Sequence, residues 1–124
     1  MTRFLDAAEV VDLHNKVSGA PLTNLGALEG AVARPYAGWG DYLEYPSIWA
    51  QVSVLLHGVC AAHAFFDGNK RAAWLACTTF LEMNGYLLID MVPKEWTDYV
   101  DDVAQHLHTL EETAFWFAAR VDLN

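Results

Sequence analysis

Positive charge is scarce in this sequence. Of 124 residues only seven are Lys or Arg, against 16 that are Asp or Glu, and the formal net charge is −9. Proteins that coat nucleic acid present clustered positive charge, so this balance argues against DNA or RNA as a partner. The acidic excess is greatest after residue 89, where apolar residues interleave the charges, a pattern typical of solvated helix faces.

Cysteine and long apolar runs are scarce as well. The two cysteines, Cys60 and Cys77, lie in apolar stretches, which indicates buried thiols in a reducing compartment rather than a disulfide. No run approaches the roughly 18 apolar residues of a membrane span, and Asp6 interrupts the N-terminus before an apolar signal segment develops. We therefore expect a cytoplasmic protein without a membrane partner.

Glycine and proline are too few for a disordered chain. Eight glycines and four prolines accompany 54% hydrophobic residues, whereas low-complexity disorder shows roughly 25–30% Gly plus Pro. A chain of this length matches one ordinary domain of about 100–150 residues and buries enough surface to need no disulfide or structural metal. We expect residues 1–124 to form a single domain.

Apolar residues recur at helical spacing along most of the chain. The pattern predicts an all-α domain of about six helices, near residues 6–18, 24–34, 47–62, 69–84, 93–107 and 109–121. The fourth segment is apolar nearly all round, which indicates a buried helix. Residues 36–46 are rich in glycine and aromatic residues without a lasting period, so we expect an irregular surface segment, with a short hairpin as the alternative. Residues 86–89 form a short extended piece at most.

One segment holds most of the chemically useful side chains. Between the two most apolar helices stand an imidazole, a carboxylate, a carboxamide and two cations, in the order His63-Ala64-Phe65-Phe66-Asp67-Gly68-Asn69-Lys70-Arg71. Gly68 and Asn69 open a buried helix, where free N–H groups and the helix dipole favour an anion. Lys70 and Arg71 lie in the first turn, where positive charge is unfavourable next to the positive end of the helix dipole unless an anion is bound. The planar guanidinium of an arginine matches the geometry of phosphate oxygens. The segment therefore predicts a phosphate site.

Three further residues of this segment have expected roles. Asp67 suits a hard divalent cation, because Mg²⁺ on a polyphosphate takes only one or two protein carboxylates. His63 follows a helix and can accept a hydroxyl proton near neutral pH, whereas we expect Phe65 to point inward as a structural anchor. Each residue also has a plain explanation, as a helix cap, a turn residue or solvated surface, and only their combination favours a functional site.

A metal site outside this segment has a weaker basis. His57, Cys60 and His63 are three residues apart in succession, so they drift round a helix by roughly 60° per step, and no fourth ligand is near them in the sequence. His14 lies beside the apolar face of the first helix. We expect it to be a hydrogen-bonded packing residue rather than a ligand.

The segment from His63 to Arg71 resembles the signature of the Fic family, His-x-Phe-x-Asp/Glu-Gly-Asn followed by a basic residue. Lys70 stands where nucleotidyl-transferring members usually carry a second glycine, and in this the chain is similar to the Doc (death-on-curing) branch. The resemblance covers nearly the whole chain and weakens after about residue 90. It implies a Fic-like helical fold in which residues 36–45 correspond in order to the flap that orients the target.

The chain departs from the family pattern at three positions. Ala64 replaces the usual proline after the histidine. Trp74 stands where nucleotidyl transferases carry a second arginine that clamps the distal phosphate, which disfavours transfer of a nucleotide monophosphate. The self-inhibitory Ser/Thr-x-x-x-Glu motif is incomplete, because Leu25 stands four residues before Glu29. The resemblance therefore implies that a separate antitoxin restrains the protein.

The resemblance to the Doc branch implies a toxin that acts as a protein kinase. Such a protein moves the terminal phosphoryl group of ATP, with Mg²⁺, onto a threonine of elongation factor Tu and arrests growth. Residue by residue, His63 would take the hydroxyl proton and Asp67 would hold the magnesium ion. The implied phosphate-binding groups are the backbone of Gly68 and the side chains of Asn69, Lys70 and Arg71.

The resemblance also implies binding partners, and two alternative functions stay open. The expected partners are elongation factor Tu and a cognate antitoxin, bound through the C-terminal segment of a Phd-like protein. A Fic-type adenylyltransferase, which transfers AMP to a protein hydroxyl, is the first alternative. A catalytically inactive helical binding module is the second.

Overall fold

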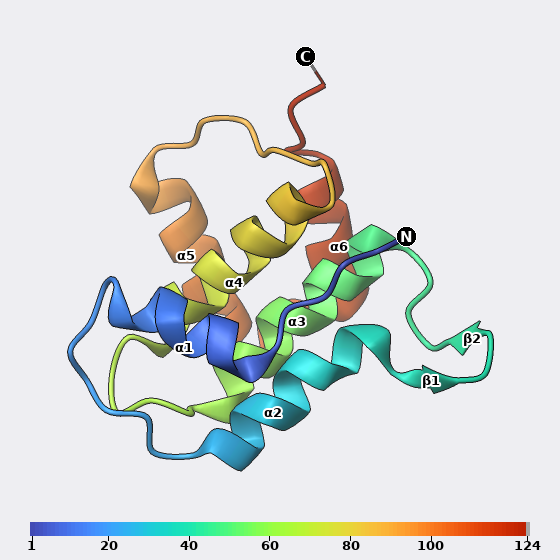
Figure 1. The fold of residues 1–124 in the computed structure, drawn as a ribbon. Helices are drawn as coiled ribbons and strands as arrows, with labels where there is room; N and C mark the ends of the chain where they lie inside the picture. The colour runs from blue at the N-terminus through green and yellow to red at the C-terminus, as the bar shows by residue number, and fades with distance from the viewer. Residues whose placement is uncertain (124) are drawn as a thin grey trace.

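The computed structural model describes residues 1–123, which fold into six helices and one small hairpin (Figure 1). The elements are α1 (Ala7–Asn15), α2 (Leu25–Ala33), a 3₁₀ turn η1 (Arg34–Tyr36), β1 (Gly38–Trp39), β2 (Tyr42–Leu43), α3 (Ile48–Ala62), α4 (Asn69–Met83), α5 (Pro93–Ala104) and α6 (Leu110–Ala118). The expected all-α class is confirmed. No helix within residues 1–123 is both long enough and apolar enough to cross a membrane.

Helices α3 and α4 form the centre of the molecule, and the other helices pack around them (Figure 1). Every residue of α3 from position 51 to position 56 is buried. Ala72, Ala73 and Ala76 of α4 are completely buried, and their small side chains let neighbouring helices approach closely. A helix that is apolar on nearly all sides needs such a covering. The expected burial of α4 is therefore confirmed.

Two outer helices begin at capping boxes that their sequences specify. At the start of α1 the Asp6 carboxylate accepts from the Glu9 N–H and the Glu9 carboxylate accepts from the Asp6 N–H. Thr109 and Glu112 make the same reciprocal pair at the start of α6. These pairs satisfy amides that a helix start otherwise leaves free.

Helices α5 and α6 each end three residues earlier than expected. Helix α5 ends at Ala104 because His106 adopts a left-handed backbone conformation, with φ of 62°, which turns the chain out of the helix. Helix α6 ends at Ala118 because the chain leaves it to pair with the extended piece after α4, where Val121 forms an antiparallel bridge with Leu88. Both ends depend on long-range or unusual backbone geometry that helical periodicity does not show.

The glycine- and aromatic-rich segment is not irregular as expected but forms the alternative, a hairpin, which projects from the helices (Figure 1). Strands β1 and β2 are antiparallel, with Gly38 opposite Leu43 and Trp39 opposite Tyr42. Gly38 has φ of 153°, and a Cβ atom there would collide with the Tyr42 carbonyl oxygen. The Trp39 side chain is 80% exposed, so it takes no part in the core.

Candidate active site

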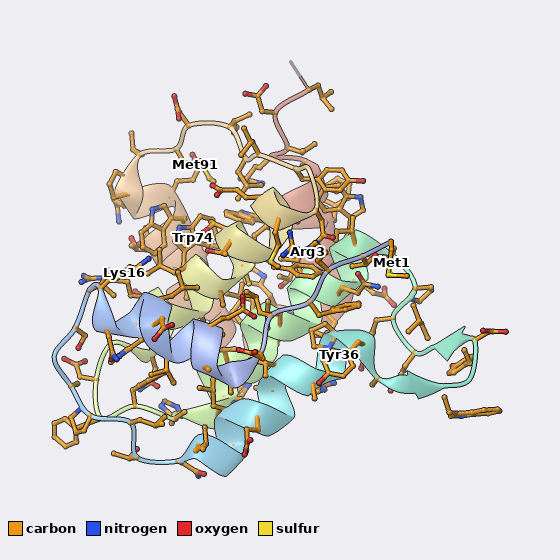
Figure 2. The ribbon with its side chains drawn as sticks, in the orientation of Figure 1. Met1, Arg3, Lys16, Tyr36, Trp74 and Met91 are labelled. Atoms are coloured by element: carbon orange, nitrogen blue, oxygen red, sulfur yellow. The ribbon has the colours of Figure 1, made fainter. Side chains whose placement is uncertain are left out.

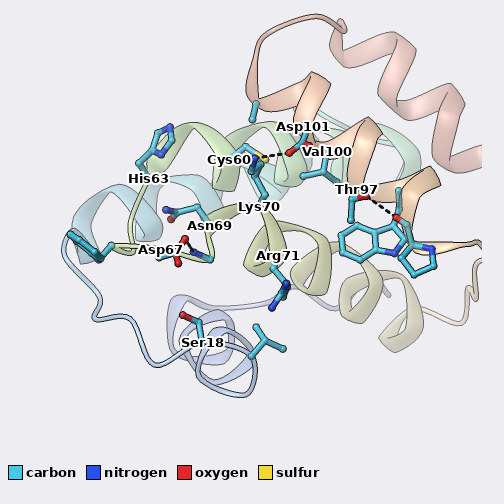
Figure 3. A pocket seen from close by; sticks show the side chains of 16 residues that line it. Ser18, Cys60, His63, Asp67, Asn69, Lys70, Arg71, Thr97, Val100 and Asp101 are labelled. Carbon is cyan, nitrogen blue, oxygen red and sulfur yellow. Dashed lines mark hydrogen bonds and ion pairs between the residues drawn. The ribbon is translucent and has the colours of Figure 1, made fainter.

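A cavity of about 620 Å³ opens between the end of α1, the start of α4 and one side of α5 (Figure 3). We call it the α4 cavity. Ser18 follows α1 and lines one edge, and Trp96, Val100 and Ala104 of α5 form an apolar wall. The cavity is also lined by all six residues that the sequence analysis assigned to catalysis, metal or phosphate: His63, Asp67, Gly68, Asn69, Lys70 and Arg71.

The loop between α3 and α4 leaves its helix abruptly at His63. This residue has a left-handed backbone, with φ of 43° and ψ of 46°, and its side chain is exposed. A non-glycine residue rarely adopts this conformation, and such residues gather at functional sites. The turn buries Ala64, whose carbonyl oxygen accepts from the backbone N–H groups of Thr23 and Asn24 and from the Thr23 hydroxyl. The surrounding chain thus fixes the position of His63.

The Asn69 side chain holds the same loop from its other end. Its Oδ1 accepts from the Phe65 N–H at 3.0 Å, and its Nδ2 donates to the Phe65 carbonyl oxygen at 2.8 Å. Phe65 itself is only 3% exposed and lies beneath the loop. The family resemblance implies that the Asn69 carboxamide binds phosphate, but in the structure this group forms two hydrogen bonds with the backbone of Phe65. Phosphate binding by this side chain stays a prediction.

Gly68 begins α4 without a side-chain cap. Its φ of 81° is a conformation that L side chains rarely adopt, and an added Cβ would lie 3.1 Å from His14 Nε2 and 3.2 Å from the Ser18 Cβ. Because α4 has no capping side chain, unlike α1 and α6, the N–H groups of its first turn remain available to a ligand. The helix dipole adds partial positive charge at the same point.

The two cations of the first turn of α4 reach in different directions. Lys70 extends toward α5, where its Nζ lies 2.6 Å from Asp101 Oδ1, whereas Arg71 extends toward α1 (Figure 3). The Lys70 and Asp101 side chains are 57% and 44% exposed. Their ion pair therefore lies at the open surface of the cavity.

Asp67 supplies a carboxylate at the edge of the α4 cavity. The side chain is exposed, and its Oδ1 accepts from the Gly68 N–H at 2.8 Å. No group of three His, Cys, Asp or Glu side chains within residues 1–123 could hold a metal ion by itself. This donor set fits Mg²⁺, which takes one or two carboxylates and completes its octahedron with phosphate and water oxygens.

His57 and Cys60, two residues of the possible metal site outside the His63–Arg71 segment, have structural roles instead. His57 Nε2 lies 2.8 Å from the Thr113 hydroxyl oxygen, and burial, followed by the charge of His108, lowers the pKa of His57. Burial raises the pKa of the Cys60 thiol to about 12. His57 thus joins α3 to α6, and Cys60 stays a protonated, unreactive thiol at neutral pH.

The comparisons with known proteins agree with this geometry. A sequence model of the Fic/DOC family matches residues 4–81, a range that includes α1, the loop after α3 and most of α4. Toxin Doc of Mycolicibacterium smegmatis is 37% identical over 107 residues, which cover 84% of this chain and 82% of that protein. The chain belongs to the Fic/DOC family.

The Fic/DOC signature, residues 63–71, forms only part of the cavity lining, because residues of α5 also line it. Helix α5 lies beyond the matched range, and Asp101, the partner of Lys70, was not predicted from the sequence. No local motif marks this residue, because Asp98 and Asp102 of the same helix give the same sequence signal. Only the packing of α5 against α3 and α4 brings Asp101 to the site.

Trp74 stands at the position where nucleotidyl-transferring members of the family carry a second arginine. Its side chain is 8% exposed and lies among the helices (Figure 2). The ring stacks on Trp96 with centroids 4.9 Å apart and an interplanar angle of 3°. It is therefore part of the aromatic core behind Trp96, and it does not line the α4 cavity.

Proposed function

We propose that this Fic/DOC protein transfers the terminal phosphoryl group of ATP to a hydroxyl group of another protein. The observation that supports this most directly is the uncapped start of α4, which brings free N–H groups, Lys70 and Arg71 into one cavity with His63 and Asp67. Phosphoryl transfer requires mainly positioning and charge stabilisation, with little covalent chemistry from the enzyme.

The proposed step uses each group of the cavity in one role. His63 accepts the proton of the acceptor hydroxyl, whose oxygen bonds to the γ phosphorus while the bond from that phosphorus to the β–γ bridging oxygen breaks. ADP leaves with the electron pair of the broken bond. Lys70, Arg71 and the first-turn N–H groups stabilise the charge on the phosphate oxygens. Asp67 would hold Mg²⁺, which neutralises phosphate charge when bound.

Trp74 favours terminal phosphoryl transfer over adenylylation. Adenylyl transfer in this family relies on a second arginine that clamps the distal phosphate, and Trp74 here lies in the aromatic core. The lysine and arginine side chains that line the cavity among the described residues are Lys70 and Arg71. These two cations in the first turn of α4 are suited to binding one phosphate group there. They are less suited to binding two separated phosphate groups of one nucleotide.

We propose a toxin of a toxin–antitoxin system as the biological role. The similarity to Toxin Doc supports this role. The proposed acceptor is a threonine of elongation factor Tu, the proposed antitoxin contact is the C-terminal segment of a Phd-like protein, and the proposed compartment is the cytoplasm. The two free buried cysteines agree with a reducing compartment.

Labelled ATP tests the proposed reaction. The purified protein is incubated with elongation factor Tu and Mg·ATP that carries its label in either the γ or the α phosphate. We expect protein-bound label from the γ phosphate only, and none with His63→Ala. Label from the α phosphate would instead show adenylylation, and absence of both labels would favour the inactive binding module.

Induced expression tests the proposed role. Growth arrest by the wild-type chain, relieved by His63→Ala and by a co-expressed antitoxin, is the expected result. Equal arrest by wild type and His63→Ala, with both variants folded, would contradict a catalytic toxin.

A further inference from the structure

His14 is a buried imidazole that the proposed reaction does not use. It lies in the last turn of α1, is 0% exposed, and contacts Asp67, which is 53 residues later in the sequence. Its Nε2 lies 2.8 Å from the Asp67 carbonyl oxygen. A carbonyl oxygen only accepts hydrogen bonds, so Nε2 must have the proton and donate it.

His14 contacts the loop before α4 at two further points. Its ring stacks on the Phe65 ring with centroids 3.7 Å apart and an interplanar angle of 9°. The ring also lies next to Gly68, where an added Cβ would be 3.1 Å from Nε2. The imidazole therefore supports the loop from its buried side, beneath the groups that face the α4 cavity.

The peptide unit between Asp67 and Gly68 is held at both ends. Its carbonyl oxygen accepts from His14 Nε2–H, and its N–H donates to Asp67 Oδ1 at 2.8 Å. Because a peptide unit is planar, rotation of its carbonyl group also rotates its N–H group. The hydrogen bond from His14 therefore fixes the direction of the N–H group that holds the Asp67 carboxylate.

We infer that His14 is a positioning residue of the phosphate-binding loop. Through the peptide unit before Gly68 it sets the direction of the Asp67 carboxylate and of the first-turn amides of α4. The identity of the ligand, Mg·ATP, rests on the proposed function. The positions of His14 and the loop come from the structure alone. His14 itself touches no reacting atom.

Two substitutions separate the hydrogen bond of His14 from its ring contact. His14→Phe keeps an aromatic ring against Phe65 and removes the donor, whereas His14→Gln keeps an amide donor of similar reach and removes the ring. The matched control is Val10→Ala, which loosens the packing of the same helix at a residue that is also 0% exposed. All variants are compared at a temperature at which circular dichroism shows them folded.

The dissociation constant for Mg·ATP is the measurement that tests the positioning role. We expect His14→Phe to raise it about tenfold, a loss of about 1.4 kcal/mol, His14→Gln to raise it less, and Val10→Ala to leave it unchanged. The rate at saturating Mg·ATP should change less than the dissociation constant. Wild-type affinity in His14→Phe, or an equal loss in Val10→Ala, would overturn the inference.

Hydrogen exchange of the Gly68 amide separates this inference from the proposed function. If the wild-type protein binds no Mg·ATP, the proposed function fails, and exchange in the ligand-free protein still tests the loop geometry. Faster exchange at Gly68 in His14→Phe than in Val10→Ala supports the positioning role. Equal exchange in the two variants contradicts it.

Discussion

His63 combines an unfavourable backbone conformation with the proposed catalytic imidazole. A left-handed conformation costs an L residue roughly 1–2 kcal/mol, while glycine adopts it freely. The conformation ends α3 and directs the chain into the loop that holds Asp67 and Gly68. Selection for stability alone would favour glycine at this position, so a histidine here is consistent with a functional requirement.

His63→Gly should therefore separate stability from activity. We expect the free energy of unfolding to stay the same or to rise by up to about 1 kcal/mol, because relief of the strain outweighs the added backbone entropy of glycine. Phosphoryl transfer should be lost with the imidazole. Chemical denaturation and the labelled-ATP assay measure the two effects, and a clearly lower free energy of unfolding would contradict this account of His63.

Gly68→Ala should damage both stability and ligand binding. The φ of 81° and the short distance from an added Cβ to His14 Nε2, 3.1 Å, both oppose the substitution. We expect a loss of about 1–2 kcal/mol in the free energy of unfolding and weaker binding of Mg·ATP. Gly30→Ala is the control, because a Cβ added to this helical glycine meets nothing within 4 Å. An equal effect of the two substitutions would show that the backbone at Gly68 has no special requirement.

At the scale of elements, α5 closes the α4 cavity and brings the carboxylate that pairs with Lys70. In the ligand-free protein this pair neutralises one of the two first-turn cations. A phosphate group bound at this point would compete with Asp101 for Lys70. We therefore expect a helix outside the signature segment to set part of the affinity for Mg·ATP.

Asp101→Asn should tighten the binding of Mg·ATP. Exposed ion pairs contribute about 0.2–1 kcal/mol, so release of Lys70 should lower the dissociation constant by up to about fivefold. Asp98→Asn is a matched control on the same helix, because Asp98 pairs with Lys94 and does not line the cavity. Weaker binding by Asp101→Asn would indicate instead that Asp101 helps to hold the magnesium ion.

A second contact between elements makes stability depend on pH. Thr113 of α6 is fully buried, and its hydroxyl oxygen lies 2.8 Å from His57 Nε2 of α3 and 3.0 Å from the Tyr99 hydroxyl of α5. Burial lowers the pKa of His57 from its ordinary 6.5, with the charge of His108 as the next cause. The folded protein therefore resists protonation of His57 more than the unfolded chain does.

This difference predicts the sign of the pH effect. Because the unfolded chain binds the His57 proton at higher pH than the folded protein, stability is greatest above about pH 6.5 and falls as the pH drops through the window below it. His57→Gln should show a smaller fall in melting temperature between about pH 8 and pH 5 than wild type. An equal fall in the two proteins would mean that His57 does not contribute.

At the scale of the whole molecule, the local pattern of the sequence was sufficient for most of the fold. Apolar spacing located all six helices, and the buried character of α4 followed from its apolar faces. The ends of α5 and α6 could not be predicted, because the left-handed His106 and the bridge between Leu88 and Val121 depend on the folded chain. Periodicity contains no information on such contacts.

The candidate site was predictable to a similar extent. The nine residues from His63 to Arg71 are contiguous, so their chemistry was visible in the sequence, and the cavity contains the six expected to act on phosphate or metal. Asp101 and the contact of His14 with the loop come from distant segments and needed the structure. The clamp of Asn69 on Phe65 could also not be read from the motif, because side-chain direction there depends on the turn at His63.

The central claim is that a nucleotide polyphosphate binds at the start of α4. Titration of the isotope-labelled protein with Mg·ATP, followed by amide NMR, tests it most directly. The account predicts saturable shifts that are largest at the amides of Gly68, Asn69 and Lys70 and that are absent in Asp67→Ala at the same ligand concentrations. Shifts centred on another part of the molecule, or none in a well-folded protein, would contradict the account.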